Sequence, residues 1–358
     1  MRRPPFVWTL AAAAVLLVVV CAAFIHGMIG EALSTGPNGP ETPASLGVPF
    51  ERVSIPSGSR RLDGYLVRAP SDCADPPAIL IYHGFEETIS KWPAAQAILW
   101  RHCVSSLVFD PSGEGDSTKP ASFSHLAQDA PAAWTFAREH FAAPTRLYVM
   151  GHSMGDAVML AAEPRLSPQP AGVIVADTFS SLKDFWAAHG TSRLLLAVLP
   201  TVWDNTAAIR RVRAPVLVVQ SDADRMTPLD QGQRVYAAAN QPKTLAVLHG
   251  YKHNGLRFHA TDAWWAPVLG FVRSPGVSRA PLAPVAAPSA PASTVGDLGA
   301  EAAREEALRQ SAAALAPAPS SAPAPGSPSA LPRTGLAPAA PPPSGPLPPP
   351  AASPLTHP

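Results

Sequence analysis

Aromatic residues are missing from the last part of this 358-residue chain. The 85 residues from Ser274 to Pro358 include no Trp, Tyr, Phe or Cys, yet they hold 21 of the 44 prolines. A segment without large apolar side chains cannot bury enough surface to offset the entropy that it loses on ordering. We therefore predict that residues 274–358 form a disordered tail rich in Pro and Ala, and the sequence does not indicate a partner for it.

Charge and cysteine are also scarce. The net charge is only +1, so the chain lacks the basic field that would draw nucleic acid, and we expect no nucleic-acid partner. The three cysteines lie far apart and the histidines lack the spacing of metal ligands, so we expect no metal and no organic cofactor. Cys73 and Cys103 permit one disulfide in an oxidising compartment, with two buried free thiols as the alternative.

Lys and Arg are missing between Arg3 and Arg52, and an almost uncharged apolar run extends from Phe6 to Ile29. This run is about 24 residues long, which is enough to span a hydrocarbon core of about 30 Å. Because basic residues favour the cytoplasmic side, we predict a transmembrane anchor at residues 1–30, with the rest of the chain in the periplasm or outside the cell. The alternative is a cleaved signal peptide, which would make the protein secreted.

A linker rich in Gly, Pro, Ser and Thr is predicted at residues 31–46, followed by one folded domain at residues 47–273. Apolar runs alternate there with helical patterns, which indicates an α/β fold with a mostly parallel sheet and helices on both faces. The predicted strands are Glu51–Ile55, Arg61–Arg68, Ala78–Tyr82, Ser105–Phe109, Leu147–Met150, Gly172–Ala176, Pro215–Gln220 and Thr244–Leu248. The predicted helices are Lys91–Arg101, Phe123–Phe141, Ser153–Ala162, Asp230–Ala239 and Thr261–Val272.

Two connections in this domain have distinct predictions. The first two strands are expected to form an antiparallel pair around a turn at Pro56-Ser57-Gly58. The segment from Phe179 to Arg213 interrupts the alternation of strands and helices. It is interpreted either as a small cap that lines an acyl pocket or as a crossover helix packed in the core.

The pentapeptide Gly151-His152-Ser153-Met154-Gly155 follows a predicted strand and opens a predicted helix. This is the context of a nucleophile elbow, in which a tight turn lifts a serine hydroxyl out of the sheet. Residues two before and two after such a serine come too close to carry side chains, which accounts for both glycines. The same turn aims the N–H of Met154 at a developing oxyanion. Ser153 is therefore the candidate nucleophile.

A serine nucleophile needs a histidine base, and that base needs a carboxylate to orient it. In this architecture the order along the chain is Ser, then Asp or Glu, then His, on loops that follow later strands. The loop after Pro215–Gln220 offers Asp224 and, as the alternative, Asp222. The loop after Thr244–Leu248 offers His253, whereas His249 still lies at the end of the strand. The predicted catalytic residues are thus Ser153, Asp224 and His253.

The second oxyanion donor is expected from the loop after Ala78–Tyr82. That loop begins His83-Gly84-Phe85, where Gly84 allows a close approach of the backbone. The predicted oxyanion hole consists of the N–H groups of Phe85 and Met154.

Taken together, these motifs resemble those of the α/β-hydrolase superfamily, in the branch of the Bem46-like and serine aminopeptidase-like hydrolases. The resemblance covers residues 50–272. It rests on Tyr82-His83-Gly84-Phe85, Asp110-Pro111-Ser112-Gly113-Glu114-Gly115-Asp116-Ser117, Gly151–Gly155, Asp224 with Met226-Thr227-Pro228, and His253-Asn254. It implies a serine hydrolase that acts through an acyl-enzyme. Two positions depart from the family pattern, Ser112 and Asp156, and the latter is expected to suit the helix dipole and to raise the pKa of His253.

The expected activity is hydrolysis of a carboxylic ester or thioester of a small acyl substrate. A serine aminopeptidase is the alternative, because Glu86, Glu87 and Glu114 follow strand ends near the expected cleft and an acidic group there would hold a substrate ammonium. A second alternative is a membrane-tethered scaffold without activity that presents the Pro-rich tail.

Overall fold

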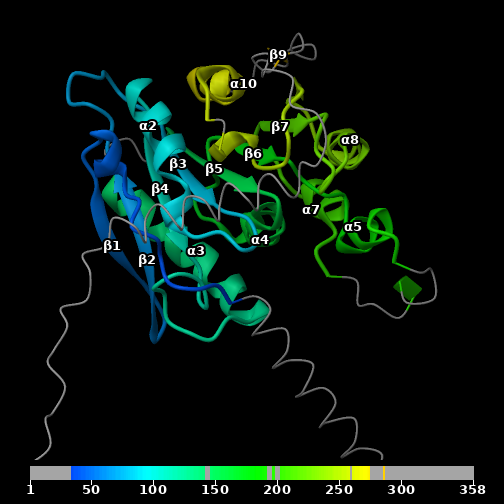
Figure 1. Ribbon diagram of the computed structural model, residues 1–358, viewed down its shortest axis with the longest axis horizontal. Helices are drawn as coiled ribbons and strands as arrows, with labels where there is room; N and C mark the ends of the chain where they lie inside the picture. Colours follow the sequence, from blue (N-terminus) through cyan, green and yellow to red (C-terminus); the bar gives the residue numbers. More distant parts are fainter. Residues whose placement is uncertain are drawn as a thin grey trace, which may run out of the picture. The chain divides into compact units, whose positions relative to one another are not determined.

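The computed structural model describes residues 34–141, 146–191, 196–197, 202–258, 260–274 and 285–286. These residues form a nine-stranded sheet in the order β1-β2-β4-β3-β5-β6-β7-β8-β9 (Figure 1). β1 is antiparallel to β2, β2 is antiparallel to β4, and the other neighbouring strands are parallel. The predicted α/β architecture is confirmed. Residues 275–284 and 287–358 lie outside the described residues, so the prediction of a disordered tail is not tested there.

Eight of the strands lie within a residue or two of their predicted positions, and the ninth, β9, was not predicted. The strands are β1 Glu51–Ser57, β2 Arg60–Val67, β3 Ala78–Tyr82, β4 Ser105–Asp110, β5 Leu147–His152, β6 Val173–Ala176, β7 Val216–Ser221, β8 Lys243–His249 and β9 Val285–Ala286. The predicted hairpin turn was misplaced, because Pro56 and Ser57 continue β1 and pair with Arg61 and Arg60. The two-residue turn is therefore Gly58-Ser59, and Gly58 adopts the positive φ of 61° that such a turn requires.

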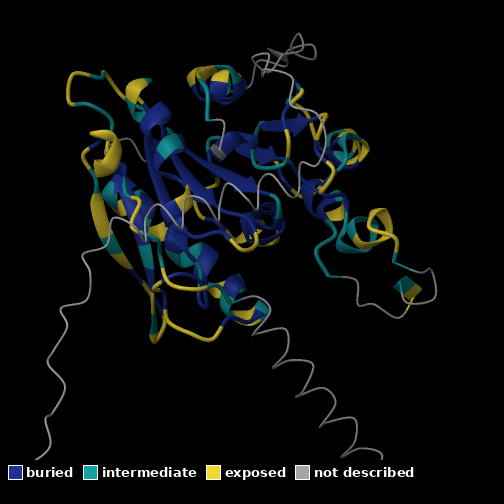
Figure 2. Cartoon of the chain, viewed as in Figure 1, coloured by how far each residue is buried: buried dark blue, intermediate teal, exposed yellow. Residues whose placement is uncertain are grey.

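Helices cover both faces of the sheet. On one face lie α3 Phe123–His140, α4 Met154–Ala162, α7 Asn205–Ile209 and α8 Leu229–Ala238. On the other lie α2 Pro93–Arg101, α9 Gly255–Phe258 and α10 Asp262–Arg273. In β3, Leu80 packs into the first layer, whereas Ile79 and Ile81 pack into the second. The central strands are buried on both faces (Figure 2), which explains why they form continuous apolar runs rather than alternating patterns.

The described residues begin with the segment 34–46, which we call the strap. It packs along the edge of the sheet at which the parallel strands have their carboxyl ends, and then along α2. The Thr35 N–H donates to the carbonyl of Gly113 (3.2 Å), and Thr35 Oγ1 accepts from the Gly115 N–H (2.9 Å). Further along, the N–H of Gly39 donates to Ser90 Oγ (3.0 Å). A short 3-10 helix, η1 Pro43–Leu46, ends the strap. Most of the predicted linker is thus held to the domain by hydrogen bonds.

A disulfide joins Cys73, in the connection from β2 to β3, to Cys103, between α2 and β4. Of the two alternatives left open by the sequence, the structure therefore has the disulfide. Both residues precede strands, so the bond lies at the edge of the sheet opposite Ser153. In the described ranges, no helix combines the length and the apolar character needed to cross a membrane, and the predicted anchor at residues 1–30 lies outside those ranges.

Candidate active site

The turn between β5 and α4 holds Ser153 in a strained conformation with φ 54° and ψ −116°. The backbone closes tightly around it. A Cβ added at Gly151 would lie 2.4 Å from Asp156 Oδ1, and one added at Gly155 would lie 2.0 Å from the carbonyl oxygen of Tyr82. Only glycine fits at both positions. Strain of this kind persists where the surrounding structure enforces it, and it marks Ser153 as a functional position.

Three side chains from three separate loops form a hydrogen-bonded relay. His253 Nε2 lies 2.9 Å from Ser153 Oγ, and His253 Nδ1 lies 2.7 Å from Asp224 Oδ2. The second oxygen of Asp224 accepts from the N–H groups of Met226 (2.7 Å) and Thr227 (2.9 Å), which fixes the carboxylate. The structure thus brings together the three residues predicted from the sequence to be catalytic.

The loop after β3 brings the N–H of Phe85 to the same edge of the sheet as Ser153, and the N–H of Met154 begins α4 directly beside the serine. Neither amide has a hydrogen-bond acceptor within the described part of the chain. Two such donors at the carboxyl edge of a parallel sheet fit the predicted oxyanion hole.

The comparisons with known proteins point in the same direction. The family described as "Serine aminopeptidase, S33" matches residues 76–208. A protein of Mycobacterium tuberculosis, described as uncharacterized, is 31% identical over 180 residues, which cover 50% of this chain and 63% of that protein. Protein bem46 of Schizosaccharomyces pombe is 24% identical over 197 residues, which cover 53% of this chain and 66% of bem46. The chain thus spans slightly less than two thirds of the length of these relatives.

Among solved structures, the esterase Pf2001 of Pyrococcus furiosus superposes with a TM-score of 0.53 at 16% identity. The match covers 66% of this chain and 94% of the esterase, which shows a shared fold. The chain belongs to the α/β-hydrolase superfamily. The matches to the family model and to bem46 confirm the branch that the sequence motifs indicated.

Behind the relay, this α/β-hydrolase has a buried polar network around Glu87. Its Oε2 accepts from the Gly84 N–H (3.1 Å) and from Trp92 Nε1 (3.0 Å), and its Oε1 lies 3.1 Å from Arg257 Nη2. Burial opposes ionisation of Glu87, but the charges of Arg257 and His152 outweigh it and lower the pKa of Glu87. Glu87 is therefore ionised and holds the oxyanion loop. The sequence interpretation of Glu87 as a ligand for a substrate ammonium is wrong.

His152, next to the nucleophile, connects this network to the catalytic histidine. Its Nδ1 lies 3.0 Å from Glu87 Oε1, and its Nε2 lies 3.1 Å from the carbonyl oxygen of His253. Burial is the main cause that lowers the pKa of His152. His152 thus positions the loop of His253 rather than taking a proton from Ser153.

A second buried network braces the other side of the oxyanion loop. His83 Nε2 lies 3.1 Å from Asp110 Oδ1, and the strap adds Asn38, whose Nδ2 donates to Asp110 Oδ2 (2.8 Å). Burial alone would lower the pKa of His83, but Glu114 and Asp110 raise it to about 9. Burial in turn raises the pKa of Glu114, which lies 3.4 Å from His83 Nε2. Because its side chain is buried, Glu114 is not accessible to a substrate.

A carboxyl group that the sequence analysis missed, Asp177, lies directly after β6 and contacts the catalytic loop. Its Oδ1 accepts from the Ser221 N–H (2.7 Å), and its backbone carbonyl accepts from Thr227 Oγ1 (2.9 Å). Burial and the charge of Asp224 raise the pKa of Asp177. Asp177 also has a positive φ of 45°, which is rare outside glycine. Nothing in the local sequence signals this contact, because it joins residues from two strands.

The expected roles of Asp156 are not supported. Its side chain is fully buried, and burial raises its pKa well above the ordinary value, so it is neutral. A neutral carboxyl cannot favour the helix dipole. For His253, burial lowers the pKa, but the hydrogen bond and the charge of Asp224 raise it overall.

A small apolar cavity of about 10 Å³ lies beside the elbow. Its apolar lining comes from β3, β4, α3 and α4 and includes Tyr82, Phe109, Leu126, Ala130, Met154 and Val158.

Of the predicted cap, the structure describes α5 Leu182–Ala188 and α7. Trp203 packs edge-to-face on Phe123, with 5.0 Å between the ring centroids. Residues 192–195 and 198–201 lie outside the described residues, so the cap's apolar run is not tested. Among the described residues, no cluster of His, Cys, Asp or Glu has the geometry of a metal site.

Proposed function

We propose that this α/β-hydrolase is a serine hydrolase that cleaves a carboxylic ester or thioester through an acyl-enzyme. One observation carries the proposal, the continuous relay from Asp224 through His253 to Ser153 Oγ. A serine hydroxyl is a weak nucleophile by itself, and a hydrogen-bonded base oriented by a carboxylate is the arrangement that activates it.

In the proposed mechanism, Asp224 accepts the Nδ1–H of His253 and so leaves the Nε2 lone pair facing Ser153. Nε2 takes the hydroxyl proton while Oγ attacks the carbonyl carbon. The N–H groups of Phe85 and Met154 stabilise the resulting oxyanion. The imidazolium then donates its proton to the departing alkoxide or thiolate, and the acyl group stays on Ser153. A water molecule, deprotonated by His253, attacks this acyl-enzyme and releases the acid.

An acyl substrate is favoured over a peptide by the surroundings of the relay. The cavity beside the elbow has a mainly apolar lining, which favours an alkyl group over a charged one, but its volume of about 10 Å³ means that side chains must move to admit an alkyl chain. The serine aminopeptidase remains the second candidate because the matching family has that description. However, Glu87 is occupied by Arg257 and Trp92, and Glu114 is buried beside His83, which leaves Glu86 as the accessible acid of the three.

We also propose that residues 1–30 tether the hydrolase to a membrane, with the domain outside the cytoplasm. The basic pair Arg2-Arg3 before the apolar run supports this orientation. The Cys73–Cys103 disulfide supports it too, because such bonds persist in oxidising compartments. If this orientation is right, a reporter that is active only in the periplasm will be active when it is fused after Arg273.

The relay argues against the alternative of a scaffold without activity, because a scaffold does not need an activated serine.

A fluorophosphonate probe tests the nucleophile. The full-length protein should be labelled, Ser153→Ala should not, and Ser71→Ala, which removes an exposed serine, should be labelled like the wild type. Labelling that persists in Ser153→Ala would refute the assignment.

The substrate class is tested with p-nitrophenyl esters of increasing chain length, for which kcat/KM should rise several-fold per methylene until the pocket is full. A flat profile with faster turnover of aminoacyl anilides would favour the peptidase.

A further inference from the structure

Large apolar side chains are exposed at the edge of the sheet that carries the relay. The described residues include four such side chains, Leu46 (54% exposed), Phe85 (42%), Trp186 (44%) and Met226 (45%). Three of them belong to segments that follow the carboxyl ends of strands. Phe85 lies in the oxyanion loop, Met226 lies two residues after Asp224, and Trp186 lies on α5. We call these three the apolar rim. Three of the four exposed large apolar side chains among the described residues thus belong to segments at this edge, and exposed apolar surface of this kind typically marks an interaction site.

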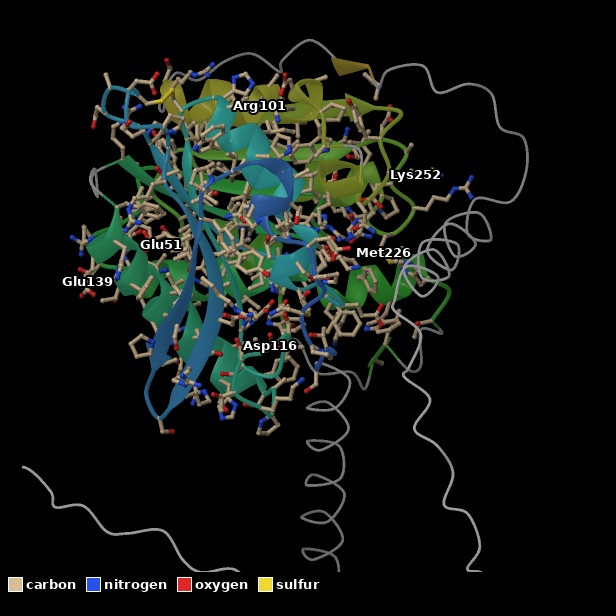
Figure 3. The ribbon with its side chains drawn as sticks, turned by 60° about the vertical axis from the view of Figure 1, so that its left-hand side comes forward. Glu51, Arg101, Asp116, Glu139, Met226 and Lys252 are labelled. Carbon is tan, nitrogen blue, oxygen red and sulfur yellow. A yellow bond between two sulfur atoms is a disulfide. The ribbon has the colours of Figure 1, made fainter. Side chains whose placement is uncertain are left out.

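Charges of both signs border the rim. Lys91, Lys183 and Arg225 belong to the segments that carry the rim and the relay. The acidic residues of these segments include Glu86, together with Asp184 and Asp230, which both contact Arg234. In Figure 3, Met226 and Lys252 lie on the same side of the molecule, away from Glu51 and Glu139.

The strap connects this same edge to the apolar run near the start of the chain. Thr35 is hydrogen-bonded to Gly113, three residues beyond the carboxyl end of β4. The run from Phe6 to Ile29 ends five residues before Ser34. Five extended residues span at most about 18 Å. If the run spans a membrane, the chain leaves the bilayer close to the edge that carries Ser153 and not close to the opposite edge.

We propose that the apolar rim docks on the surface of the bilayer to which the chain is tethered, so that Ser153 faces the lipid. Aromatic residues such as the exposed Phe85 and Trp186 favour the interfacial region of a bilayer. The acyl substrate then reaches the relay from the lipid leaflet rather than from water. This inference rests on the proposed function, a tethered serine hydrolase, and adds the surface that meets the membrane and the phase that supplies the substrate.

Fluorescence quenching tests the docking without any need for catalysis. The full-length protein, with Cys21→Ser and one new cysteine carrying an environment-sensitive fluorophore, is placed in nanodiscs of brominated phosphatidylglycerol. A probe at Met226→Cys should be quenched several-fold more strongly than one at Glu139→Cys, on the opposite side. Equal quenching at the two positions would overturn the proposal.

Two matched substitutions test the consequence for turnover. Trp186→Asp places a charge on the rim, and Leu46→Asp places one on an equally exposed apolar residue outside it. In the same nanodiscs without bromine, Trp186→Asp should slow the hydrolysis of a bilayer-embedded fluorogenic ester about tenfold and leave the rate with water-soluble p-nitrophenyl acetate unchanged. Leu46→Asp should change neither rate.

The outcomes separate the two proposals. If Trp186→Asp leaves the embedded ester's rate unchanged, or lowers both rates equally, the docking inference is wrong while the hydrolase stands. If the wild type hydrolyses neither ester and Ser153 takes no fluorophosphonate label, the proposed function fails, and the quenching comparison still decides whether the rim meets the bilayer.

Discussion

Two Asp–His pairs connect the loop after β7 to the carboxyl end of β8 and the loop that follows it, and only one of them reaches a nucleophile. Asp224 contacts His253, and two residues earlier Asp222 contacts His249. The side chains of the first pair are 0% and 16% exposed, whereas those of the second are 28% and 43% exposed. His253 goes on to contact Ser153 Oγ. The pairs therefore share their chemistry and differ in burial and in what lies beyond the histidine.

This difference shows why residue type alone did not identify the catalytic aspartate. Asp224 accepts hydrogen bonds from two backbone N–H groups and from Thr227 Oγ1, which hold an ionised carboxylate in a buried place. Asp222 accepts one backbone bond, from Gly250, contacts His249 and is partly exposed to solvent. A charge in a buried site acts strongly on its neighbour, whereas an exposed charge is screened by water.

The largest expected effect separates the two aspartates by activity. Asp224→Asn should lower kcat by about 10⁴-fold, the loss typical of a triad carboxylate, because the amide no longer fixes the tautomer of His253. Asp222→Asn should leave kcat within a few-fold of the wild type. Steady-state kinetics with a p-nitrophenyl ester measure both, and the reverse ranking would show that Asp222 is the functional carboxylate.

The pH dependence should report the charge of His253. Because Asp224 raises the pKa of His253, the ring becomes protonated, and loses its function as a base, already at a pH above its ordinary value of 6.5. The rate kcat/KM should therefore fall about tenfold per pH unit below a midpoint that lies above 6.5. A midpoint below 6.5 would show that burial dominates over the carboxylate.

Removal of the hydroxyl that supports Asp224 should have a smaller effect. Thr227→Val keeps the shape of the side chain but loses the 2.6 Å hydrogen bond to Asp224 Oδ2. We expect kcat to fall about tenfold, which corresponds to about 1.4 kcal/mol for one bond to a charged group. Thr206→Val, which loses a hydroxyl bond to the carbonyl of Ser180 away from the relay, is the control. An equal loss in both variants would point to a general effect on packing.

Asp177 should tolerate the substitution that Asp224 does not. Because the raised pKa of Asp177 indicates a neutral carboxyl, Asp177→Asn replaces it with a neutral group of the same shape. The rate kcat/KM between pH 6 and 7 should stay within about threefold of the wild type. A loss comparable to that of Asp224→Asn would mean that Asp177 carries the charge at this site.

The smallest effect is expected from the exposed pair. Surface ion pairs typically contribute less than about 1 kcal/mol, so Asp222→Ala with His249→Ala should lower the free energy of unfolding by no more than that. A double-mutant cycle in urea measures the coupling energy between the two residues. A coupling above about 2 kcal/mol would show that this pair is a structural element of the loops.

Much of the fold and of the site followed from local sequence patterns, and the remainder depends on contacts between distant residues. A short stretch of consecutive residues specifies the strand Ala78–Tyr82, and another specifies the elbow around Ser153. The positions of both were predicted correctly. The bond from Asn38 to Asp110 joins residues 72 positions apart, so no local pattern announces it. Glu87 was taken for a residue at the rim of the cleft because its partner, Arg257, lies far along the chain.

The central claim is that the Asp224–His253 pair makes Ser153 a covalent nucleophile, and mass spectrometry of the acyl-enzyme tests it most directly. Trypsin releases Leu147–Arg165, a peptide in which Ser153 is the only serine. After a rapid acid quench during turnover of a p-nitrophenyl ester, this peptide should carry the acyl mass in the wild type and in His249→Ala, but not in His253→Ala. An unmodified peptide in the active wild type, or an acyl group on another peptide, would contradict the account.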